Sequence, residues 1–86
     1  MRFRLSQHAE WELVRRQIPR NLLEAVLEKS EQRLPEAGGK EIYQSRVASR
    51  GGKMYLLRVI VSADKVPPVV VTVYRTSKIE KYWRPE

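Results

Sequence analysis

The spacing of hydrophobic residues changes once along the chain, near its middle. Before Lys40, apolar side chains recur every three or four positions, as they do along one side of an α-helix. From Lys40 onwards they alternate with polar side chains, as in a strand that is buried on one face. The pattern therefore predicts two N-terminal helices followed by a small sheet.

The first helix is predicted from Gln7 to Arg16. Ser6 suits its N-cap, because a serine hydroxyl accepts a hydrogen bond from a backbone N–H that has no partner inside the helix. Its buried stripe is expected to consist of Trp11, Val14 and Ile18. A second helix should have Pro19 in its first turn. Its buried stripe is expected to consist of Leu22, Leu23, Val26 and Leu27.

The sheet is predicted from three alternating segments. "EIYQSRVAS" (41–49) and "MYLLRVIVS" (54–62) flank "RGGK", whose glycines favour a tight hairpin turn. A turn at "ADKVPP" precedes the third strand, "VVVTVYR" (69–75), while "RFRL" (2–5) fits either a strand or a lead-in. The predicted fold class is α+β: one domain, 1–86, with two helices on one face of an antiparallel sheet and the other face free.

Arg58 interrupts the hydrophobic pattern of the middle strand. Tyr55, Leu57, Val59 and Val61 form one apolar face, and Arg58 belongs to the opposite one. Because burial of an unpaired cation is unfavourable, Arg58 is expected to face solvent, a carboxylate or a ligand phosphate. A two-residue hairpin loop would place Arg46 and Arg58 on opposite faces, and a bulge would place them on the same face. The sequence leaves both arrangements open.

The charge distribution adds to this picture. The net charge is +7, and the half from residue 42 carries nine basic and three acidic residues, against eight and seven before it. The excess of positive charge therefore lies in the predicted sheet and the segment after it. Such an asymmetry predicts an anionic partner, with a merely solubilising surface as the alternative.

Composition also limits the kinds of chemistry that the chain can support. It has no cysteine and only one histidine, His8, so neither a disulfide nor a multi-histidine zinc site can form within it. No stretch approaches the roughly 20 apolar residues of a membrane-spanning helix, and the first residues lack an apolar signal segment. We expect a cytoplasmic protein that uses no metal or cofactor and binds no membrane.

Cations alternate with aromatic rings in the last strand and the residues after it. Arginine and lysine bind phosphates and rings stack on unpaired bases, so the pattern predicts a surface for single-stranded RNA. The candidates are Arg46, Arg58, Tyr74, Arg75, Lys78, Lys81, Tyr82, Trp83 and Arg84. The alternative is a charged edge strand whose tail packs back through its rings. His8 could act as an acid or base, or donate to a phosphate, although a lone histidine more often has a structural role.

Two motifs give the chain a family resemblance. S-x-H-A at Ser6–Ala9 and T-x-Y-x-T-x-K-x-x-K-Y-W at Thr72–Trp83 resemble domain of unknown function 4258, which is placed with the RelE/ParE/BrnT-like toxins. The resemblance covers almost the whole chain. It implies a two-helix, antiparallel-sheet fold and a toxin of a type II toxin–antitoxin pair.

The resemblance also implies site residues and partners. RelE-like members cleave messenger RNA, including messenger RNA on the ribosome, without a metal, and pair with an antitoxin expected to carry an acidic segment. Carried over to this chain, the catalytic candidates are His8, Arg58, Lys78, Lys81 and Tyr82. The RNA-binding candidates are Arg16, which keeps a basic position of the family, and four residues from the pattern of cations and rings: Arg46, Tyr74, Arg75 and Arg84.

One position departs from the family pattern. Glu12 stands where the family often has a basic residue, and Arg16 keeps the second basic position. Glu12 is expected to pair with a nearby arginine or to weaken phosphate binding. Because ParE-like relatives on the same scaffold target gyrase, a gyrase-directed toxin and a non-catalytic nucleic-acid-binding module are the alternatives to a ribonuclease.

Overall fold

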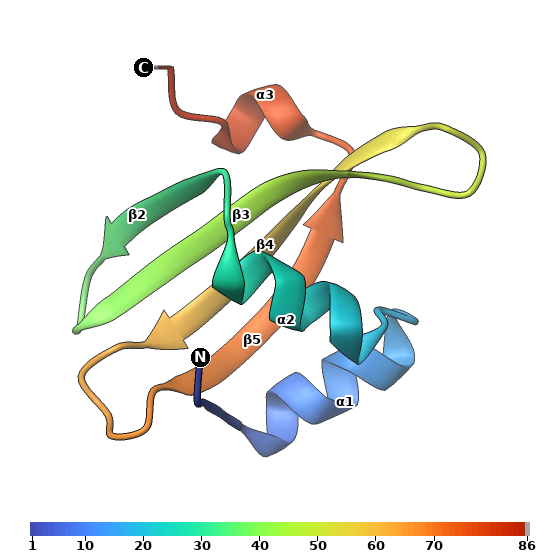
Figure 1. Ribbon diagram of the computed structural model, residues 1–86. Coiled ribbons are helices and arrows are strands. Elements are labelled where there is room, and N and C mark those ends of the chain that lie inside the picture. Colours follow the sequence, from blue (N-terminus) through green and yellow to red (C-terminus); the bar gives the residue numbers. More distant parts are fainter. Residues whose placement is uncertain (86) are drawn as a thin grey trace.

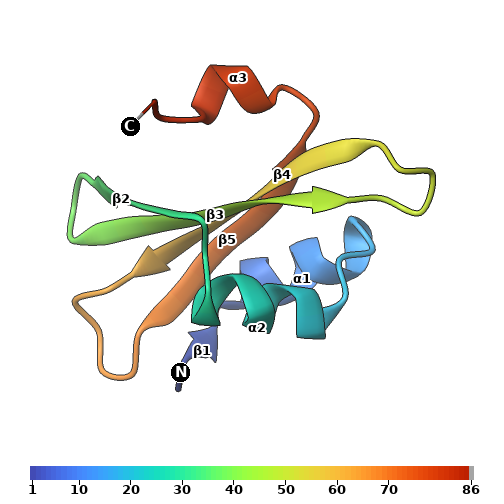
Figure 2. The same cartoon turned by 45° about the horizontal axis from the view of Figure 1, so that its top comes forward.

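The computed structural model describes residues 1–85 and contains one sheet with a helical layer on one face and a short helix over the other (Figure 2). Figure 1 labels the elements along the chain. They are β1 (Arg4–Leu5), α1 (Gln7–Arg15), α2 (Arg20–Glu28), β2 (Gln32–Glu36), β3 (Lys40–Ala48), β4 (Met54–Ser62), β5 (Val69–Thr76) and α3 (Ile79–Tyr82). The predicted α+β class is confirmed. No helix within residues 1–85 is long and apolar enough to cross a membrane.

Helix α1 begins and ends through local hydrogen bonds. The Ser6 hydroxyl accepts from the Ala9 N–H at 3.0 Å, as predicted for an N-cap, and donates to the Val71 carbonyl of β5 at 2.8 Å. At the other end, the Ile18 N–H donates to the Leu13 carbonyl at 2.9 Å, and Gln17 adopts a φ of 54°. This pattern is a Schellman motif, in which a left-handed residue stops the helix.

The buried face of α1 differs from the prediction. Trp11 and Val14 are 58% and 78% exposed, and the buried helix residues are Ala9, Glu12 and Leu13. The predicted stripe is therefore wrong at Trp11 and Val14, while Ile18 is buried beyond the end of the helix. Glu12 can be buried because Arg15 and Arg16 both pair with its carboxylate, which is the first of the two alternatives considered for this position.

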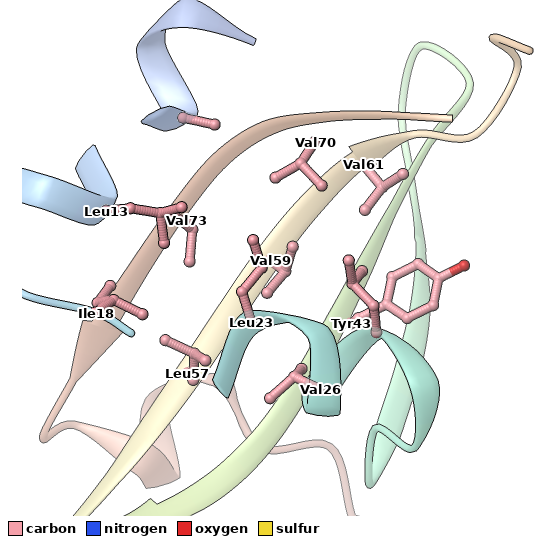
Figure 3. Close-up of a cluster of buried hydrophobic side chains, with 12 residues drawn as sticks. Leu13, Ile18, Leu23, Val26, Tyr43, Leu57, Val59, Val61, Val70 and Val73 are labelled. Carbon is pink, nitrogen blue, oxygen red and sulfur yellow. The ribbon is translucent and has the colours of Figure 1, made fainter. Parts of the chain in front are cut away.

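The hydrophobic core lies between the two long helices and one face of the sheet (Figure 3). Pro19 is the N-cap of α2 rather than part of its first turn. The helix buries three residues of its predicted stripe, and Leu22 is partly buried. The sheet contributes mainly β-branched side chains, whose stiff χ1 angles suit a pleated surface. The fully buried sheet residues of this helix-facing cluster are Leu57, Val59, Val61, Val70 and Val73.

The sheet has five strands in the order β1-β5-β4-β3-β2. Strand β1 runs parallel to β5, through Arg4 opposite Val69, so the sheet is mixed and the purely antiparallel prediction is corrected. Strand β2 was not predicted, because Pro35 appeared to end the helical region. Proline is tolerated there because β2 is an edge strand, where a backbone N–H on the outer side needs no partner.

The β3–β4 hairpin settles how the two arginines face. The Ser49 N–H donates to the Lys53 carbonyl at 2.8 Å, which leaves three residues, 50–52, in the loop. Gly52 adopts a φ of 84°, which favours glycine. In this register Arg46 lies opposite Leu56, and Arg58 lies opposite Gln44. Because residues two apart in a strand share a face, Arg46 and Arg58 point to the same side of the sheet.

That second face is not free. Helix α3 and the residues around it turn back across the sheet on the side opposite α1 and α2 (Figure 2). Segment Ser77–Pro85, called the C-terminal segment from here on, contacts the sheet through Tyr82 and Arg84. The prediction of an uncovered face is therefore wrong. Strand β5 ends at Thr76, opposite Leu56 near the start of β4, and the chain then turns back over the sheet.

Candidate functional site

Four polar side chains form a continuous row across the second face of the sheet. Gln32 of β2 lies opposite Gln44 of β3, Gln44 lies opposite Arg58 of β4, and Arg58 lies opposite Tyr74 of β5. Directly opposed residues in neighbouring strands bring their side chains into contact. We call Gln32, Gln44, Arg58 and Tyr74 the polar row.

Hydrogen bonds run along the polar row from end to end. Arg58 Nε donates to Gln44 Oε1 at 2.9 Å, and Arg58 Nη1 donates to the Tyr74 hydroxyl at 2.6 Å. Gln44 Nε2 donates to Gln32 Oε1 at 2.7 Å. No buried side-chain nitrogen or oxygen in the described part of the chain lacks a partner. The row is thus a satisfied polar network, which fixes the direction of the guanidinium.

Arg58 is a buried cation without a carboxylate partner among residues 1–85. It is 9% exposed, and no ion pair in the described residues includes it. Its neighbours are an amide, a hydroxyl, and the rings of Tyr82 and Tyr74, whose centroids lie 4.2 Å and 5.8 Å from Cζ. The expectation that Arg58 faces solvent or a carboxylate is therefore corrected. A buried charge with only neutral partners is unfavourable for stability and is a feature of functional sites.

The C-terminal segment is attached to the polar row by its backbone. Gln44 Nε2 donates to the Tyr82 carbonyl at 3.2 Å. Gln32 Nε2 donates to the Arg84 carbonyl at 2.6 Å, and the Arg84 N–H donates back to Gln32 Oε1 at 3.2 Å. These bonds place the Tyr82 ring over the Arg58 guanidinium, where a cation–π interaction is favourable.

Arg46 lies on the same face but is already paired. Its guanidinium donates to both carboxylate oxygens of Glu31, at 3.1 Å and 2.9 Å, and its backbone N–H donates to Oε1 at 2.7 Å. These hydrogen bonds hold the pKa of Glu31 below its ordinary value, against the opposing effect of burial. The Arg46 guanidinium also lies 4.3 Å from the centre of the Trp83 ring. Arg46 thus contacts the Trp83 ring, and it differs from Arg58 because it has a carboxylate partner.

Three exposed cations lie in the C-terminal segment: Lys78, Lys81 and Arg84. None of them forms an ion pair within residues 1–85. Lys81 Nζ lies 5.3 Å from the centre of the Tyr82 ring, which itself covers Arg58. The structure therefore gathers Arg58, Tyr74, Lys81 and Tyr82 in one place, with Lys78 and Arg84 in the same short segment.

Three predicted site residues lie on the other side of the sheet. Arg75 is opposite Leu57, whose side chain belongs to the helix-facing core, so Arg75 points away from Arg58. Arg16 is paired with Glu12 at the end of α1. His8 is exposed in the first turn of α1, which is on the helical side, with its ring centroid 6.3 Å from that of Trp11. The structure does not bring these three residues to the polar row.

Gln32, Gln44 and Glu31 were missed at the sequence level. Gln44 is fully buried, and its position between Ile42 and Arg46 in an alternating strand places it on the Arg58 face. That signal becomes readable only when the hairpin register is known, since a shift of one residue moves Gln44 away from Arg58. Gln32 and Glu31 gave no signal, because strand β2, which begins at Gln32 directly after Glu31, was not predicted.

The donor groups of the site suit anions. No three His, Cys, Asp or Glu side chains in the described residues are arranged to hold a metal ion. Guanidinium, ammonium and hydroxyl groups instead offer hydrogen bonds to phosphate oxygens. Comparisons of the chain with protein-family models, with curated proteins and with solved structures give no match. The resemblance to domain of unknown function 4258 therefore stays a prediction.

Proposed function

We propose that this chain is a RelE-like toxin of a type II toxin–antitoxin pair that binds messenger RNA in the cytoplasm and cleaves it without a metal. The observation that carries the proposal is Arg58, a buried guanidinium whose described partners are all neutral. A backbone phosphate supplies the negative charge that these partners lack. The element order, a short strand, two helices and then four strands, supports the RelE-like fold as part of the same proposal.

The chemistry that we propose uses the RNA itself as the nucleophile. The 2′-hydroxyl attacks the adjacent phosphorus and gives its proton to water, forming a 2′,3′-cyclic phosphate as the P–O5′ bond breaks. The leaving O5′ takes a proton from the Tyr82 hydroxyl, which recovers one from solvent. Arg58 and Lys81 stabilise the negative charge that develops on the phosphoryl oxygens. Lys78 and Arg84 bind neighbouring phosphates.

This assignment leaves His8 out of the chemistry. Helix α1, which contains His8, lies on one side of the sheet, whereas α3, which contains Lys81 and Tyr82, lies on the opposite side (Figure 2). A proton shuttle between His8 and a phosphate on Arg58 would have to pass through the core. Tyr82 is therefore the proton donor that we favour.

A non-catalytic RNA-binding module is the second candidate function. It is favoured by the exposed Lys81 beside the Tyr82 ring, since cations and rings also suit RNA recognition without cleavage. The two functions differ in what happens to RNA length. They agree in requiring a salt-sensitive affinity for RNA.

The test is incubation of the purified protein with labelled single-stranded RNA and with translating ribosomes, in EDTA. We expect cleavage products ending in a 2′,3′-cyclic phosphate, and their loss in the Tyr82→Phe variant. The Tyr82 hydroxyl makes no hydrogen bond to another residue of 1–85, so this variant keeps the ring and the fold. RNA that is bound but stays intact would support the non-catalytic module. Absence of both binding and cleavage would reject both candidates, and altered DNA supercoiling on expression would then indicate the gyrase-directed alternative.

The partner that we propose is an antitoxin with an acidic segment. Its expected binding surface is the basic C-terminal segment, where Lys78, Lys81 and Arg84 are exposed without an ion-pair partner in the described chain. An acidic peptide on this surface would compete with RNA for the same cations. Competition between the peptide and RNA in a binding assay tests this part of the proposal.

A further inference from the structure

The C-terminal segment contacts the sheet through hydrogen bonds and through the half-buried rings of Tyr82 and Trp83. Helix α3 has four residues, none of them buried, and neither its N-cap residue Lys78 nor any other side chain caps its start. Apart from the Lys78 N–H bond to the Thr76 hydroxyl at the end of β5, the hydrogen bonds from the segment to the sheet involve the amide groups of Gln32 and Gln44. No residue of the segment is fully buried, and a terminal segment of this kind opens more easily than the core.

The segment covers the group that the proposed function needs. Arg58 uses Nε and Nη1 for Gln44 and Tyr74, and the Tyr82 ring covers its flat face at 4.2 Å. With 9% of the residue exposed, a nucleic-acid phosphate cannot reach the guanidinium while Tyr82 stays in place. The observed arrangement is therefore a closed one.

We propose that the C-terminal segment is a lid that keeps Arg58 from RNA until it lifts, an inference that rests on the proposed RNA-binding function. The amide pair Gln32–Gln44 is the latch, because it holds the backbone of Tyr82 and Arg84. The hinge lies at the end of β5, where the Lys78 N–H donates to the Thr76 hydroxyl at 3.1 Å.

A phosphate drives the opening because it interacts differently with the two states. In the closed state Arg58 has only neutral partners, whereas in the open state a phosphate gives the guanidinium its counter-charge. The latch opposes this favourable interaction, because it keeps small the fraction of molecules in which the lid is open. The apparent affinity for RNA is lowered in proportion to that fraction. Lys81 and Tyr82 travel with the lid and close over the bound phosphate, which places the proposed proton donor beside it.

The latch can be weakened without touching Arg58. Gln32 contacts Gln44 and Arg84 but makes no hydrogen bond to Arg58, so Gln32→Leu loosens the lid and leaves the guanidinium in place. Gln7→Leu, on the exposed start of α1, is the matched control. All variants carry Trp11→Phe, which leaves Trp83 as the single tryptophan and reports on the lid.

A second pair of variants guards against a folding defect in Gln32→Leu. Arg84→Pro and Arg84→Ala both remove the exposed arginine side chain, but only proline also removes the N–H that donates to Gln32. Trp83 already has an extended backbone, with φ −70° and ψ 130°, which is the conformation required before a proline. A difference between the two variants therefore reports the change in the backbone of residue 84, which removes one hydrogen bond of the latch.

The experiment measures quenching of Trp83 by acrylamide and the Kd for a short single-stranded RNA that carries 2′-O-methyl riboses and cannot be cleaved. We expect Gln32→Leu to expose Trp83 and to bind this RNA about three- to tenfold more tightly than Gln7→Leu, because the open fraction rises. Arg84→Pro should likewise bind more tightly than Arg84→Ala. Binding that is equal or weaker in both latch variants would overturn the lid and leave the RNA-binding function intact. No binding by any variant, including Gln7→Leu, would overturn both.

Discussion

Arg58 and Gln44 lie directly opposite each other on neighbouring strands, and Arg58 Nε donates to Gln44 Oε1 at 2.9 Å. Because Gln44 is fully buried, Gln44→Met leaves a buried cationic donor without its acceptor. We expect a loss of about 2–3 kcal/mol in the free energy of unfolding. The double variant Arg58→Met/Gln44→Met should cost less than the sum of the two single changes, because it removes both partners together. Urea unfolding of all three variants measures this, and additive losses would contradict it.

Tyr74→Phe and Tyr82→Phe form a matched pair that separates stability from catalysis. The Tyr74 hydroxyl accepts from Arg58 Nη1 at 2.6 Å, so Tyr74→Phe should lower the free energy of unfolding by about 1.5 kcal/mol. Tyr82→Phe should change it by less than about 0.5 kcal/mol. If Tyr82 protonates the leaving group, the same variant should reduce RNA cleavage about 10²–10⁴-fold. Equal cleavage by wild type and Tyr82→Phe would remove Tyr82 from the mechanism.

RNA affinity should depend on which side of the sheet a cation occupies. Lys81 is beside Tyr82, whereas Arg75 points to the helix-facing side. Lys81→Ala should weaken binding of single-stranded RNA and reduce the slope of log Kd against log salt by about 1, the value for one lost phosphate contact. Arg75→Ala should leave both quantities unchanged. The measurement is fluorescence anisotropy over a range of salt concentrations, and an equal effect of both variants would contradict the assignment.

Gln17 is the left-handed residue that ends α1, with a φ of 54°. A side chain with a Cβ is strained in this conformation, and glycine is not. Gln17→Gly should therefore raise the free energy of unfolding by about 0.5–1 kcal/mol, after allowance for the greater freedom of glycine in the unfolded chain. Thermal and urea unfolding measure the change. Asn21→Gly, at an exposed position inside α2, should have the opposite effect and serves as the control.

The protein should lose stability in acid through three carboxylates. Hydrogen bonds from arginines hold the pKa values of Glu12, Glu31 and Glu41 below the ordinary value of 4.5. A carboxyl group with a lowered folded-state pKa contributes stability that is complete above its unfolded pKa and is lost as pH falls through the folded value. Tm should therefore decrease as the pH falls below about 4.5.

Single variants test the origin of this acid sensitivity. Glu31→Gln should flatten the dependence of Tm on pH, because it removes the carboxylate that Arg46 holds. Glu36→Gln is the control, since Glu36 forms no ion pair with another residue of 1–85. A similar flattening by both variants would assign the acid sensitivity to general charge repulsion.

The sequence predicted those helices and strands that are determined by residues close to one another in the chain. Ser6 begins α1 through its hydroxyl, and the alternation in residues 41–49 and 54–62 predicted the hairpin. Strand β2 was missed because a proline in an edge strand leaves no local sign of pairing. The buried face of α1 was predicted wrongly because Glu12 is neutralised by Arg15 and Arg16, so hydrophobicity alone misassigns that position.

The candidate site, like the fold, could be predicted from the sequence only in part. Residue types alone predicted a basic and aromatic surface near the C-terminus. They also marked Arg58 as an exception within a hydrophobic strand. The exclusion of His8, Arg16 and Arg75 was not, because it depends on which face of the sheet each residue occupies. Nor could Gln32 be assigned to the site before its pairing with Gln44 was known.

The sequence by itself determined the α+β class, the hairpin and the concentration of positive charge in the second half, because hydrophobic period, turn residues and charge are local properties. Only the tertiary structure decided that Arg58 is buried, that two glutamines hold it, and that Tyr82 covers it. The physical reason is register. A strand can shift by one residue with little change in its local preferences, yet that shift moves every side chain to the opposite face.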